Sequence, residues 1–492
     1  MSLVLPVLLP LAAIPFLIAA GERHANRREA VSLAAGALLF LHLLRLAPAV
    51  FRGARPETRL FDFLPGIAFG FRLEPLGMLF ALVAALLWIA TTLYAIGYMR
   101  GHHEQHQTRF YTCFAIAISA TMGAALARNL LTLFLFYELL TFSTVPLVTH
   151  HGTDEARRGG RTYLGILLGT SVAFLLPAIL LAWHLAGTLD FTDGGILRGT
   201  AERPMLMLLL ALFAFGIGKA ALMPFHRWLP AAMVAPTPVS ALLHAVAVVK
   251  VGVFTMLKVL VYIFGIDLLH ELRLSDWLAY VAGFTLIAAS LVAMFQDNLK
   301  RRLAYSTVSQ LSYIVLGGAV ATSAGALGAG MHIAMHAFGK ITLFFCAGAI
   351  YVAAHKTRVS ELDGLGRRMP FTFAAFALAA LSIIGLPPGG GLWSKLLLAL
   401  GTADSGHTLL LAALMISSLL NVAYLLPIPM RAFLAQPPQV QEHEDEAHPH
   451  GEAPLPSVIA LCFTAACTVL LFLAPTPLYR ALQGMVLTGG TP

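Results

Sequence analysis

The sequence predicts an all-α polytopic membrane protein with about fourteen transmembrane helices. Of its 492 residues, 58% are hydrophobic and only 11% are charged, and the mean hydropathy is +0.80. A soluble domain carries roughly 25% charged residues, so this composition excludes an ordinary soluble protein. The apolar residues also gather into runs of roughly 20, the length that crosses a hydrocarbon core as a helix.

The expected spans follow one another along the whole chain with short connections between them. The first span lacks a basic leading segment and a small-residue cleavage site, so we expect a permanent helix there rather than a signal peptide. In order, the spans lie near residues 3–20, 30–48, 76–98, 110–127, 129–148, 162–186, 205–223, 238–262, 275–295, 303–322, 326–353, 371–399, 408–433 and 456–478.

Basic residues mark one side of the membrane. The odd-numbered connections are rich in arginine and lysine, and the positive-inside rule places them in the cytoplasm. Fourteen spans then leave both termini on the outer side of a bacterial inner (cytoplasmic) membrane. The net charge of +8 is therefore a signal of topology rather than of nucleic-acid binding. The basic residues of the odd connections are Arg23, Arg27, Arg28, Arg100, Arg109, Arg157, Arg158, Arg161, Lys300, Arg301, Arg302, Lys356, Arg358, Arg367 and Arg368.

Two connections, residues 49–75 and 436–454, are the extramembrane features that we expect. The second is acidic, rich in proline, and contains His443, His448 and His450. A metal site is one interpretation of these histidines. The low complexity of the stretch favours the other interpretation, a solvated flexible loop.

The cysteines give no sign of a redox or metal centre. All four lie inside expected spans and none forms a CxxC pair, so neither a disulfide framework nor a metal or iron–sulfur site is predicted. The sequence also lacks a nucleotide-binding loop and a dinucleotide glycine fingerprint. We therefore expect no cofactor and no catalytic redox site in this chain. The cysteines are Cys113, Cys346, Cys462 and Cys467.

Helix breakers interrupt two of the spans. Pro224 follows the apolar run of the seventh span, and the twelfth contains IIGLPPGGGLWSK at 383–395. Lipid cannot satisfy the backbone groups that such residues free, so the breaks belong inside protein or beside water. Breaks five spans apart predict two inverted five-helix repeats, spans 4–8 and 9–13. The predicted segments are 1–109 with helices 1–3, 110–262 and 263–435 with the two repeats, and 436–492 with the acidic, His-rich loop and the last helix.

Several ionisable residues lie deep inside the spans. A charge at the bilayer centre costs at least about 2.5–3.5 kcal/mol, so each needs a partner, water or a function. Glu138 is ten residues from Arg128 and thirteen from His151, too far to reach either interface. The others are Lys219 in the seventh span, His244 and Lys250 in the eighth, His332, His336 and Lys340 in the eleventh, and Lys395 after the break in the twelfth.

The spacing of these residues favours a shared path. His332, His336 and Lys340 are four residues apart and line one face of a helix. His244 and Lys250 are six residues apart, so their side chains point in directions about 120° apart around a helix. They could still flank one water-filled path. Hydroxyl and amide side chains gather near the start of the tenth span: Tyr305, Ser306, Thr307, Ser309 and Gln310.

Structural roles are the alternatives. A lone buried histidine such as His244 is as often a satisfied core residue as a functional one. A lysine near a span end usually extends to the headgroups, which we expect for Lys258 and Lys300 and which remains an alternative for Lys250. A structural ion pair between Glu138 and Lys219 is the main alternative for those two residues, although such pairs often fail to offset their desolvation cost.

Proton transfer is the chemistry that these residue types allow. Removal from water favours a neutral lysine and a nearby carboxylate favours the charged form. Movement of Glu138 would therefore switch whether Lys219 holds a proton. Neutral lysine and histidine can both pass a proton through intervening water, so the row predicts a proton relay. Its proton-holding residues are Glu138, Lys219, Lys250, Lys340 and Lys395, supported by His244, His332 and His336.

Several stretches resemble a known family, the antiporter-like subunits shared by respiratory complex I, Mrp-type sodium/proton antiporters and membrane-bound hydrogenases. The similarity covers roughly residues 70–430, and HRWLP…APTPVSALLH is its most specific part. The similar stretches are FYELLTFSTVPLV, GKAALMPFHRWLPAAMVAPTPVSALLHAVAVVKVGVF, KRRLAYSTVSQLSYIVLG, MHIAMHAFGKITLFFCAGAI and GLPPGGGLWSK.

The resemblance implies a fold of fourteen helices with two inverted five-helix repeats. It also implies roles by position. Glu138 is similar to the glutamate that tunes the seventh-helix lysine, here Lys219, and Lys250 to a bridging lysine. The resemblance further identifies His332, His336 and Lys340 with the eleventh-helix connection and Lys395 with the terminal site.

Within the family, Lys395 and the compact length are most similar to the D subunit of Mrp antiporters and its hydrogenase counterpart. We therefore expect a proton-translocating subunit of a multi-subunit cation/proton antiporter, with other membrane subunits as partners, protons and sodium as candidate ions, and no nucleic acid. The stretch FYELLTFSTVPLVTHH departs from the sequence that is usual in Mrp subunits. A pumping subunit of a redox complex (NADH:quinone oxidoreductase or membrane-bound hydrogenase) therefore stays open, as does the membrane subunit of a proton-driven inorganic-carbon uptake complex.

Overall fold

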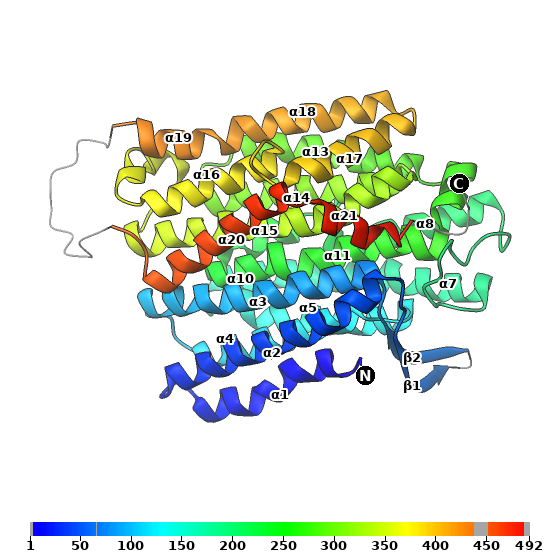
Figure 1. Ribbon diagram of the computed structural model, residues 1–492, viewed down its shortest axis with the longest axis horizontal. Coiled ribbons are helices and arrows are strands. Elements are labelled where there is room, and N and C mark those ends of the chain that lie inside the picture. Colours follow the sequence, from blue (N-terminus) through cyan, green and yellow to red (C-terminus); the bar gives the residue numbers. More distant parts are fainter. Residues whose placement is uncertain (1–2, 65, 437–450, 487–492) are drawn as a thin grey trace.

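A computed structural model describes residues 3–64, 66–436 and 451–486 of the chain. Its helices run side by side along the long axis of the molecule, with a β-hairpin at one end (Figure 1). Within these described ranges, nine helices are long and apolar enough to cross a membrane, and three shorter apolar helices accompany them. The predicted helical, polytopic architecture is confirmed. His443, His448 and His450 lie outside the described residues.

The first eight expected spans all contain helices. The sixth is one continuous rod, because a π-helical segment at Ser171–Leu175 joins its two α-helices, and the eighth contains two such segments. The helices are α1 (Leu5–Ala20), α2 (Ala25–Phe51), α3 (Pro75–Gly101), α4 (Gln107–Ala125), α5 (Leu130–Val148), α6 (Asp154–Thr170), α7 (Leu176–Ala186), α8 (Arg203–Gly216), the short α9 (Trp228–Ala231), α10 (Thr237–Ala241) and α11 (Val248–Lys258).

The remaining six expected spans also contain helices, and the twelfth is divided into α16 and α17. Short helices lie at the ends of several rods. The helices are α12 (Ile266–Leu272), α13 (Asp276–Met294), α14 (Leu299–Ala319), α15 (Ser323–Ala354), α16 (Pro370–Ile384), α17 (Gly391–Asp404), α18 (Thr408–Leu425), α19 (Pro427–Leu434), α20 (Leu455–Leu473) and α21 (Thr476–Gln483).

Side chains that precede four of these helices fix where the helices begin. The Asn129 side chain accepts a hydrogen bond from the backbone N–H of Thr132, and Thr153, Asn298 and Thr322 cap α6, α14 and α15 in the same way. Such caps satisfy backbone donors that the first helical turn leaves free. They therefore specify helix starts where the connections are only a few residues long.

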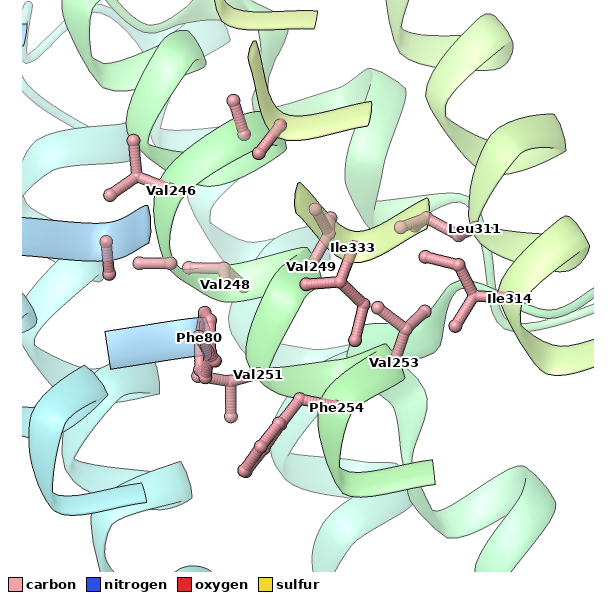
Figure 2. Close-up of a cluster of buried hydrophobic side chains, with 14 of the residues drawn as sticks. Phe80, Val246, Val248, Val249, Val251, Val253, Phe254, Leu311, Ile314 and Ile333 are labelled. Atoms are coloured by element: carbon pink, nitrogen blue, oxygen red, sulfur yellow. The ribbon is translucent and has the colours of Figure 1, made fainter. Parts of the chain in front are cut away.

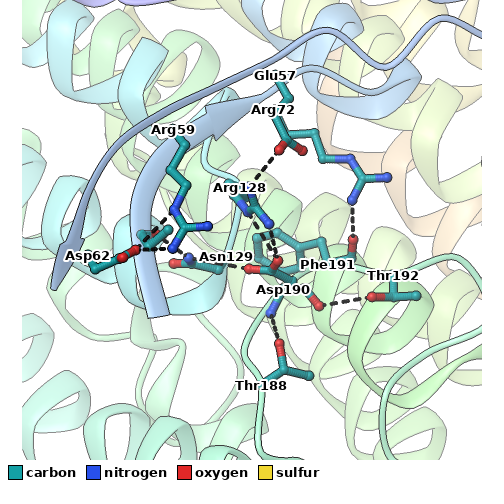
Figure 3. Close-up of polar contacts among 11 residues, drawn as sticks. Glu57, Arg59, Asp62, Arg72, Arg128, Asn129, Thr188, Asp190, Phe191 and Thr192 are labelled. Atoms are coloured by element: carbon teal, nitrogen blue, oxygen red, sulfur yellow. Dashed lines mark hydrogen bonds and ion pairs between the residues drawn. The ribbon is translucent and has the colours of Figure 1, made fainter. Parts of the chain in front are cut away.

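The connection at 49–75 contains the one pair of β-strands in the described part of the chain. Strands β1 (Glu57–Leu64) and β2 (Ile67–Arg72) pair antiparallel. Polar contacts tie this hairpin to the start of α5 (Figure 3). Arg128 donates to Glu57 at 2.6 Å and to Asp190 at 2.7 Å, and Asn129 donates to the Ala68 carbonyl at 2.6 Å. The hairpin is therefore held against the helix that carries Glu138.

Helix α11 lies at the centre of the molecule. In the rod Thr237–Phe264, every residue of the 18-residue apolar window is buried. Figure 2 shows its valines and Phe254 packed against Phe80 of α3, Leu311 and Ile314 of α14 and Ile333 of α15. A rod surrounded by protein on all sides can carry a polar side chain without exposing it to lipid, and α11 carries Lys250.

Both predicted helix breaks are confirmed. Helix α8 ends at Gly216 and a 3-10 turn follows at Gly218–Ala220, while α16 and α17 are separated by residues 385–390. The first break packs closely on α11, because a Cβ at Gly252 would lie 2.6 Å from the Lys219 carbonyl oxygen. Lys219 thus sits in the break itself rather than in a regular helix. The assignment of 110–262 and 263–435 to two repeats stays a prediction.

Candidate functional site: a buried row of lysines and histidines

Lys219 is anchored by helix α5. Its Nζ donates to the Tyr137 carbonyl at 2.9 Å and to the Thr141 hydroxyl at 2.6 Å, and lies 3.2 Å from the centre of the Tyr137 ring. The Tyr137 hydroxyl accepts from the Lys219 backbone N–H at 3.1 Å. Lys219 is fully buried. Two hydrogen bonds and a cation–π contact therefore hold an ammonium group that is removed from bulk solvent.

Glu138 lies near the middle of α5, next in sequence to Tyr137. Both of its carboxylate oxygens are buried, and neither has a hydrogen-bond partner among the described residues. The direct ion pair between Glu138 and Lys219, the structural alternative, is therefore not formed in this arrangement. Buried carboxylates without protein partners are normally hydrogen-bonded to water. The structure thus places the glutamate beside the lysine's anchor but leaves it free to change its partners.

Lys250 and His336 meet at the centre of the molecule. Lys250 Nζ lies 2.6 Å from His336 Nδ1, and both side chains are almost completely buried. These residues come from α11 and α15 and are 86 positions apart in the sequence. Lys250 therefore does not extend to the headgroups. The structure instead joins the two helices through a contact short enough for proton transfer.

A second set of contacts continues from His336 toward α17. The rings of His336 and His332 are stacked with centres 5.8 Å apart. His332 Nδ1 lies 2.9 Å from the Ser394 hydroxyl, and Ser394 immediately precedes Lys395. Lys395 is 9% exposed and its Nζ donates to the Ile384 carbonyl at 3.1 Å, at the break between α16 and α17. Contacts thus lead from Lys250 through His336 and His332 to Ser394, which lies beside the second helix break.

Lys340 belongs to a side branch of this row. Its Nζ donates to the Ser306 hydroxyl at 2.8 Å, and the Tyr424 hydroxyl lies 2.9 Å from the same Ser306 oxygen. Lys340 lies on α15 with His332 and His336, and all three side chains are buried. The hydrogen-bond partner of Lys340, however, is Ser306 of α14, which in turn contacts Tyr424 of α18 rather than a residue of α11 or α17.

His244 is buried in the π-helical segment Leu242–Val246. Neither ring nitrogen has a hydrogen-bond partner in the described part of the chain, and the ring lies 4.6 Å from that of Phe344. A histidine kept only for packing normally satisfies at least one nitrogen. His244 therefore needs water or a transient proton partner.

The prediction for Lys258 is wrong. We expected it to extend to the headgroups, but its side chain is 0% exposed and forms an ion pair with Glu74 at the start of α3. Its Nζ also lies 3.7 Å from the centre of the Phe191 ring. The partner is 184 residues away in the sequence, so position within the span could not reveal it. Lys300 is half-buried and donates to the Ala235 carbonyl at 2.6 Å.

Other polar residues of the site were missed by sequence reasoning. Tyr137 and Thr141 lie in an apolar run and do not stand out there. Tyr137 directly precedes Glu138, and Thr141 follows it three positions later, about one helical turn away. Ser394 precedes Lys395, and that adjacency is a signal that could have found it. Tyr313 has no such signal: its ring centre lies 4.4 Å from Lys395 Nζ only because α14 packs beside α17.

The charge balance of the row limits what it can do. Lys219, Lys250, Lys340 and Lys395 are buried, and none of them forms an ion pair within the described residues, whereas Lys258 is neutralised by its direct pair with Glu74. An uncompensated buried charge costs several kcal/mol. This favours states in which not all four lysines carry a proton. Such a row can take up and release protons, and the histidines between the lysines provide intermediate acceptors.

Family comparisons agree with the motifs. The family described as NADH:quinone oxidoreductase/Mrp antiporter, TM, matches residues 127–421, and the one described as NADH-Ubiquinone oxidoreductase (complex I), chain 5 N-terminus, matches residues 65–111. The first match covers the eight residues of the row and both helix breaks.

Relatives of this chain include members of two kinds of complex. NADH-quinone oxidoreductase subunit N of Desulforudis audaxviator is 32% identical over 459 residues, 91% of this chain and 90% of the relative. The A/B subunit of a probable K(+)/H(+) antiporter from Rhizobium meliloti is 32% identical over 380 residues, 75% of this chain but only 37% of the relative. The chain thus spans nearly all of one relative and about a third of the other.

Two solved structures have the same fold. A chain of the archaeal membrane-bound sulfane sulfur reductase superposes with a TM-score of 0.85 at 23% identity and covers 98% of this chain and 96% of that one. A chain of the Mrp complex from Dietzia sp. DQ12-45-1b gives 0.82 at 22% identity, with 98% and 97% covered. At such identities the likeness concerns the fold alone. The family match and the 32% identical full-length relative go further, and they show that this chain belongs to the NADH:quinone oxidoreductase/Mrp antiporter family of membrane subunits.

Proposed function

We propose that this chain translocates protons along the buried row as one subunit of a multi-subunit cation/proton antiporter, similar to the D subunit of Mrp-type complexes. The contact between Lys250 and His336 at 2.6 Å carries the proposal, because it joins the two halves of the row at the centre of the molecule. Glu138, Lys219, Lys250, Lys340 and Lys395 hold protons, and His244, His332 and His336 pass them on. Lys395 beside the second break supports the D-like assignment.

In this proposal Glu138 acts as a switch on Lys219. With the carboxylate apart, as in this structure, Lys219 Nζ has Tyr137 and Thr141 as its partners and the charged form of the lysine lacks a counter-ion. When the carboxylate approaches, the charged lysine gains a counter-ion and keeps its proton. When it withdraws, the proton is released toward Lys250. The ion pair is therefore a transient state of the cycle, in keeping with a carboxylate that has no permanent partner.

The test is cation-driven proton movement in inverted membrane vesicles that contain the whole complex. We expect Lys250→Met to reduce it at least about tenfold, equivalent to about 1.4 kcal/mol in the barrier, while co-purification of partner subunits is unchanged. Arg23→Met is the matched control, because it removes a positive charge from an exposed connection. Proton movement near the wild-type rate in Lys250→Met would show that the pair with His336 is structural.

A second candidate function is proton pumping as a membrane subunit of a redox complex. The relative that matches along 90% of its length, a subunit of NADH-quinone oxidoreductase, favours it. The oxidoreductase activity would then belong to partner subunits. Purification in mild detergent separates the candidates: small membrane subunits indicate the antiporter, flavin or nickel–iron subunits the redox complex, and a soluble zinc protein the carbon-uptake complex.

A further inference from the structure

A cavity of about 220 Å³ opens at the end of the molecule where the basic connections lie. It is bounded by the connection after α5 (His151), the start of α10 (Thr237), the start of α14 (Lys300) and the end of α15 (Tyr351). Helix α10 leads to His244, and α15 carries His332 and His336. The cavity therefore lies where two rods of the buried row reach the surface.

A cluster of titratable side chains stands at the rim of this cavity. The Glu104 carboxylate lies 3.1 Å from His102 Nδ1, 3.2 Å from His151 Nε2 and 3.9 Å from His150 Nε2. Glu104 is only 7% exposed, whereas His151 is 36% exposed. His102 Nε2 also lies 3.2 Å from the hydroxyl of Tyr351, which lines the cavity. One histidine thus faces water while the carboxylate that pairs with it is buried.

The members of this cluster differ in how they hold protons. Burial alone would raise the pKa of Glu104, but the hydrogen bond from His151 and the nearby histidine charges outweigh it and lower that pKa. The hydrogen bond to Glu104 raises the pKa of His151 above its ordinary value, against the effect of burial. Burial lowers the pKa of His150 to about 4. His151 therefore holds a proton to higher pH than a free histidine, and His150 stays neutral near pH 7.

The remaining charged and titratable groups around Glu104 come from four elements. None of them is a second carboxylate in the described part of the cluster, so no other acid competes for the proton of His151. They are Tyr98 of α3, Arg109 of α4, which donates to the His150 carbonyl at 2.8 Å, Lys300 of α14 and Tyr351 of α15, and Lys356, just after α15, lines the same cavity.

Unpartnered polar atoms lead from the cavity into the protein. Thr237 lines the cavity, and Ser240 and His244 follow it three and seven positions along the same rod. The Ser240 hydroxyl and both nitrogens of His244 are buried without hydrogen-bond partners among the described residues. Buried polar groups are normally satisfied by protein or by ordered water. Water between Thr237 and His244 would satisfy these atoms and connect the cavity with the row.

We propose that Glu104 and His151 form a proton-collecting site that loads the buried row through the cavity and along Thr237, Ser240 and His244. This rests on the proposed function. The exposed His151 takes a proton from bulk water and becomes an imidazolium paired with Glu104. It passes that proton to water in the cavity and returns to neutral imidazole, ready for the next one. The pair of Glu104 and His151 thus keeps a proton available at high pH, where the concentration of hydronium in bulk water is low.

The test compares pH profiles of proton movement in vesicles for Glu104→Gln, His151→Gln and the control His103→Asn. His103 lies in the same loop, is exposed and has positive φ, which asparagine tolerates. We expect both test variants to lose about fivefold or more of the rate at pH 8 and to stay within about twofold of wild type at pH 6. Profiles that superimpose on that of the control would overturn the proposal.

A second measurement does not depend on transport. Diethylpyrocarbonate modifies neutral imidazole, so the pH dependence of its reaction, followed by mass spectrometry on the intact complex, reports the protonation of each histidine. We expect the midpoint for His151 to lie above that of histidine in an unstructured reference peptide and to fall in Glu104→Gln. A midpoint for His151 in the wild type equal to that of the reference peptide would refute a proton-holding pair even if a variant fails to assemble.

The failures of the two proposals are distinguishable. If Lys250→Met transports like wild type, the relay itself is wrong. If Lys250→Met is inactive while Glu104→Gln and His151→Gln keep the wild-type profile, only the collecting site is wrong.

Discussion

Gly252→Ala should disable the site without touching any titratable group. Gly252 lies on the buried helix α11, where a Cβ would be 2.6 Å from the Lys219 carbonyl oxygen and closer still to the Lys219 carbonyl carbon and the Ala220 nitrogen. All three contacts are backbone atoms, so no flexible side chain can give way. The 3-10 turn has to move by about 1 Å to restore van der Waals separation.

That movement is large compared with the contacts it disturbs. The bond from Lys219 Nζ to the Thr141 hydroxyl is 2.6 Å long, and a shift of about 1 Å stretches it beyond the range of a hydrogen bond. Overpacking costs about 1–3 kcal/mol, partly offset by about 1 kcal/mol from the better helix propensity of alanine. The fold should therefore survive, while proton movement falls about tenfold or more because Lys219 loses its position.

The assay is cation-driven proton movement in vesicles together with the thermal unfolding midpoint of the purified complex. Gly169→Ala in α6 is the matched control, because a Cβ there meets no atom within 4 Å. It should transport like wild type and be as stable or slightly more so. If Gly252→Ala transports within about twofold of wild type, the position of the turn does not control Lys219 and the reasoning fails.

Three further outcomes are expected. Glu74→Gln and Lys258→Met should each lower the free energy of unfolding by about 3–5 kcal/mol, and the double variant by much less, as thermal unfolding would measure; additive losses would contradict the buried pair. Ser394→Ala removes the 2.9 Å contact with His332 and should slow proton movement in vesicles while leaving assembly intact; an unchanged rate would place the path elsewhere. Arg128→Met removes the side-chain bond to Glu57 at the start of the hairpin and should increase hydrogen exchange across residues 57–72, whereas unchanged exchange would show that the strands need no such anchor.

The spans and the presence of a break in the seventh and the twelfth could be predicted from the sequence because each depends on local composition, although α8 ends at Gly216, before the expected end of its span. An apolar run of sufficient length must become a helix in lipid, and Pro224 or the glycines after Pro388 must interrupt it. The hairpin at 57–72 was missed although a Pro-Gly pair separates two runs rich in β-formers. This Pro-Gly pair is a turn signal, and it indicates a hairpin in a connection that we expected only to be extramembrane.

The candidate residues could likewise be found because they lie within apolar runs of the sequence. Their hydrogen-bond partners could not be found in this way. Position within an apolar run identifies Lys219 and Lys250 as buried ionisable residues. It also leads to the wrong prediction that the Lys258 side chain extends to the lipid headgroups. Each lysine's environment is set by a helix distant in the sequence: α5 for Lys219, α15 for Lys250 and the start of α3 for Lys258.

The sequence by itself determined that this chain spans a membrane many times, where its helices break and which ionisable groups enter the bilayer, since lipid penalises charge and free backbone groups wherever they occur. The tertiary structure alone decided that Glu138 stands apart from Lys219 and that Lys250 meets His336. The physical reason is that hydrophobic burial specifies which face of a helix turns inward but not which neighbour it meets, and proton transfer depends on that neighbour at a distance of about 3 Å.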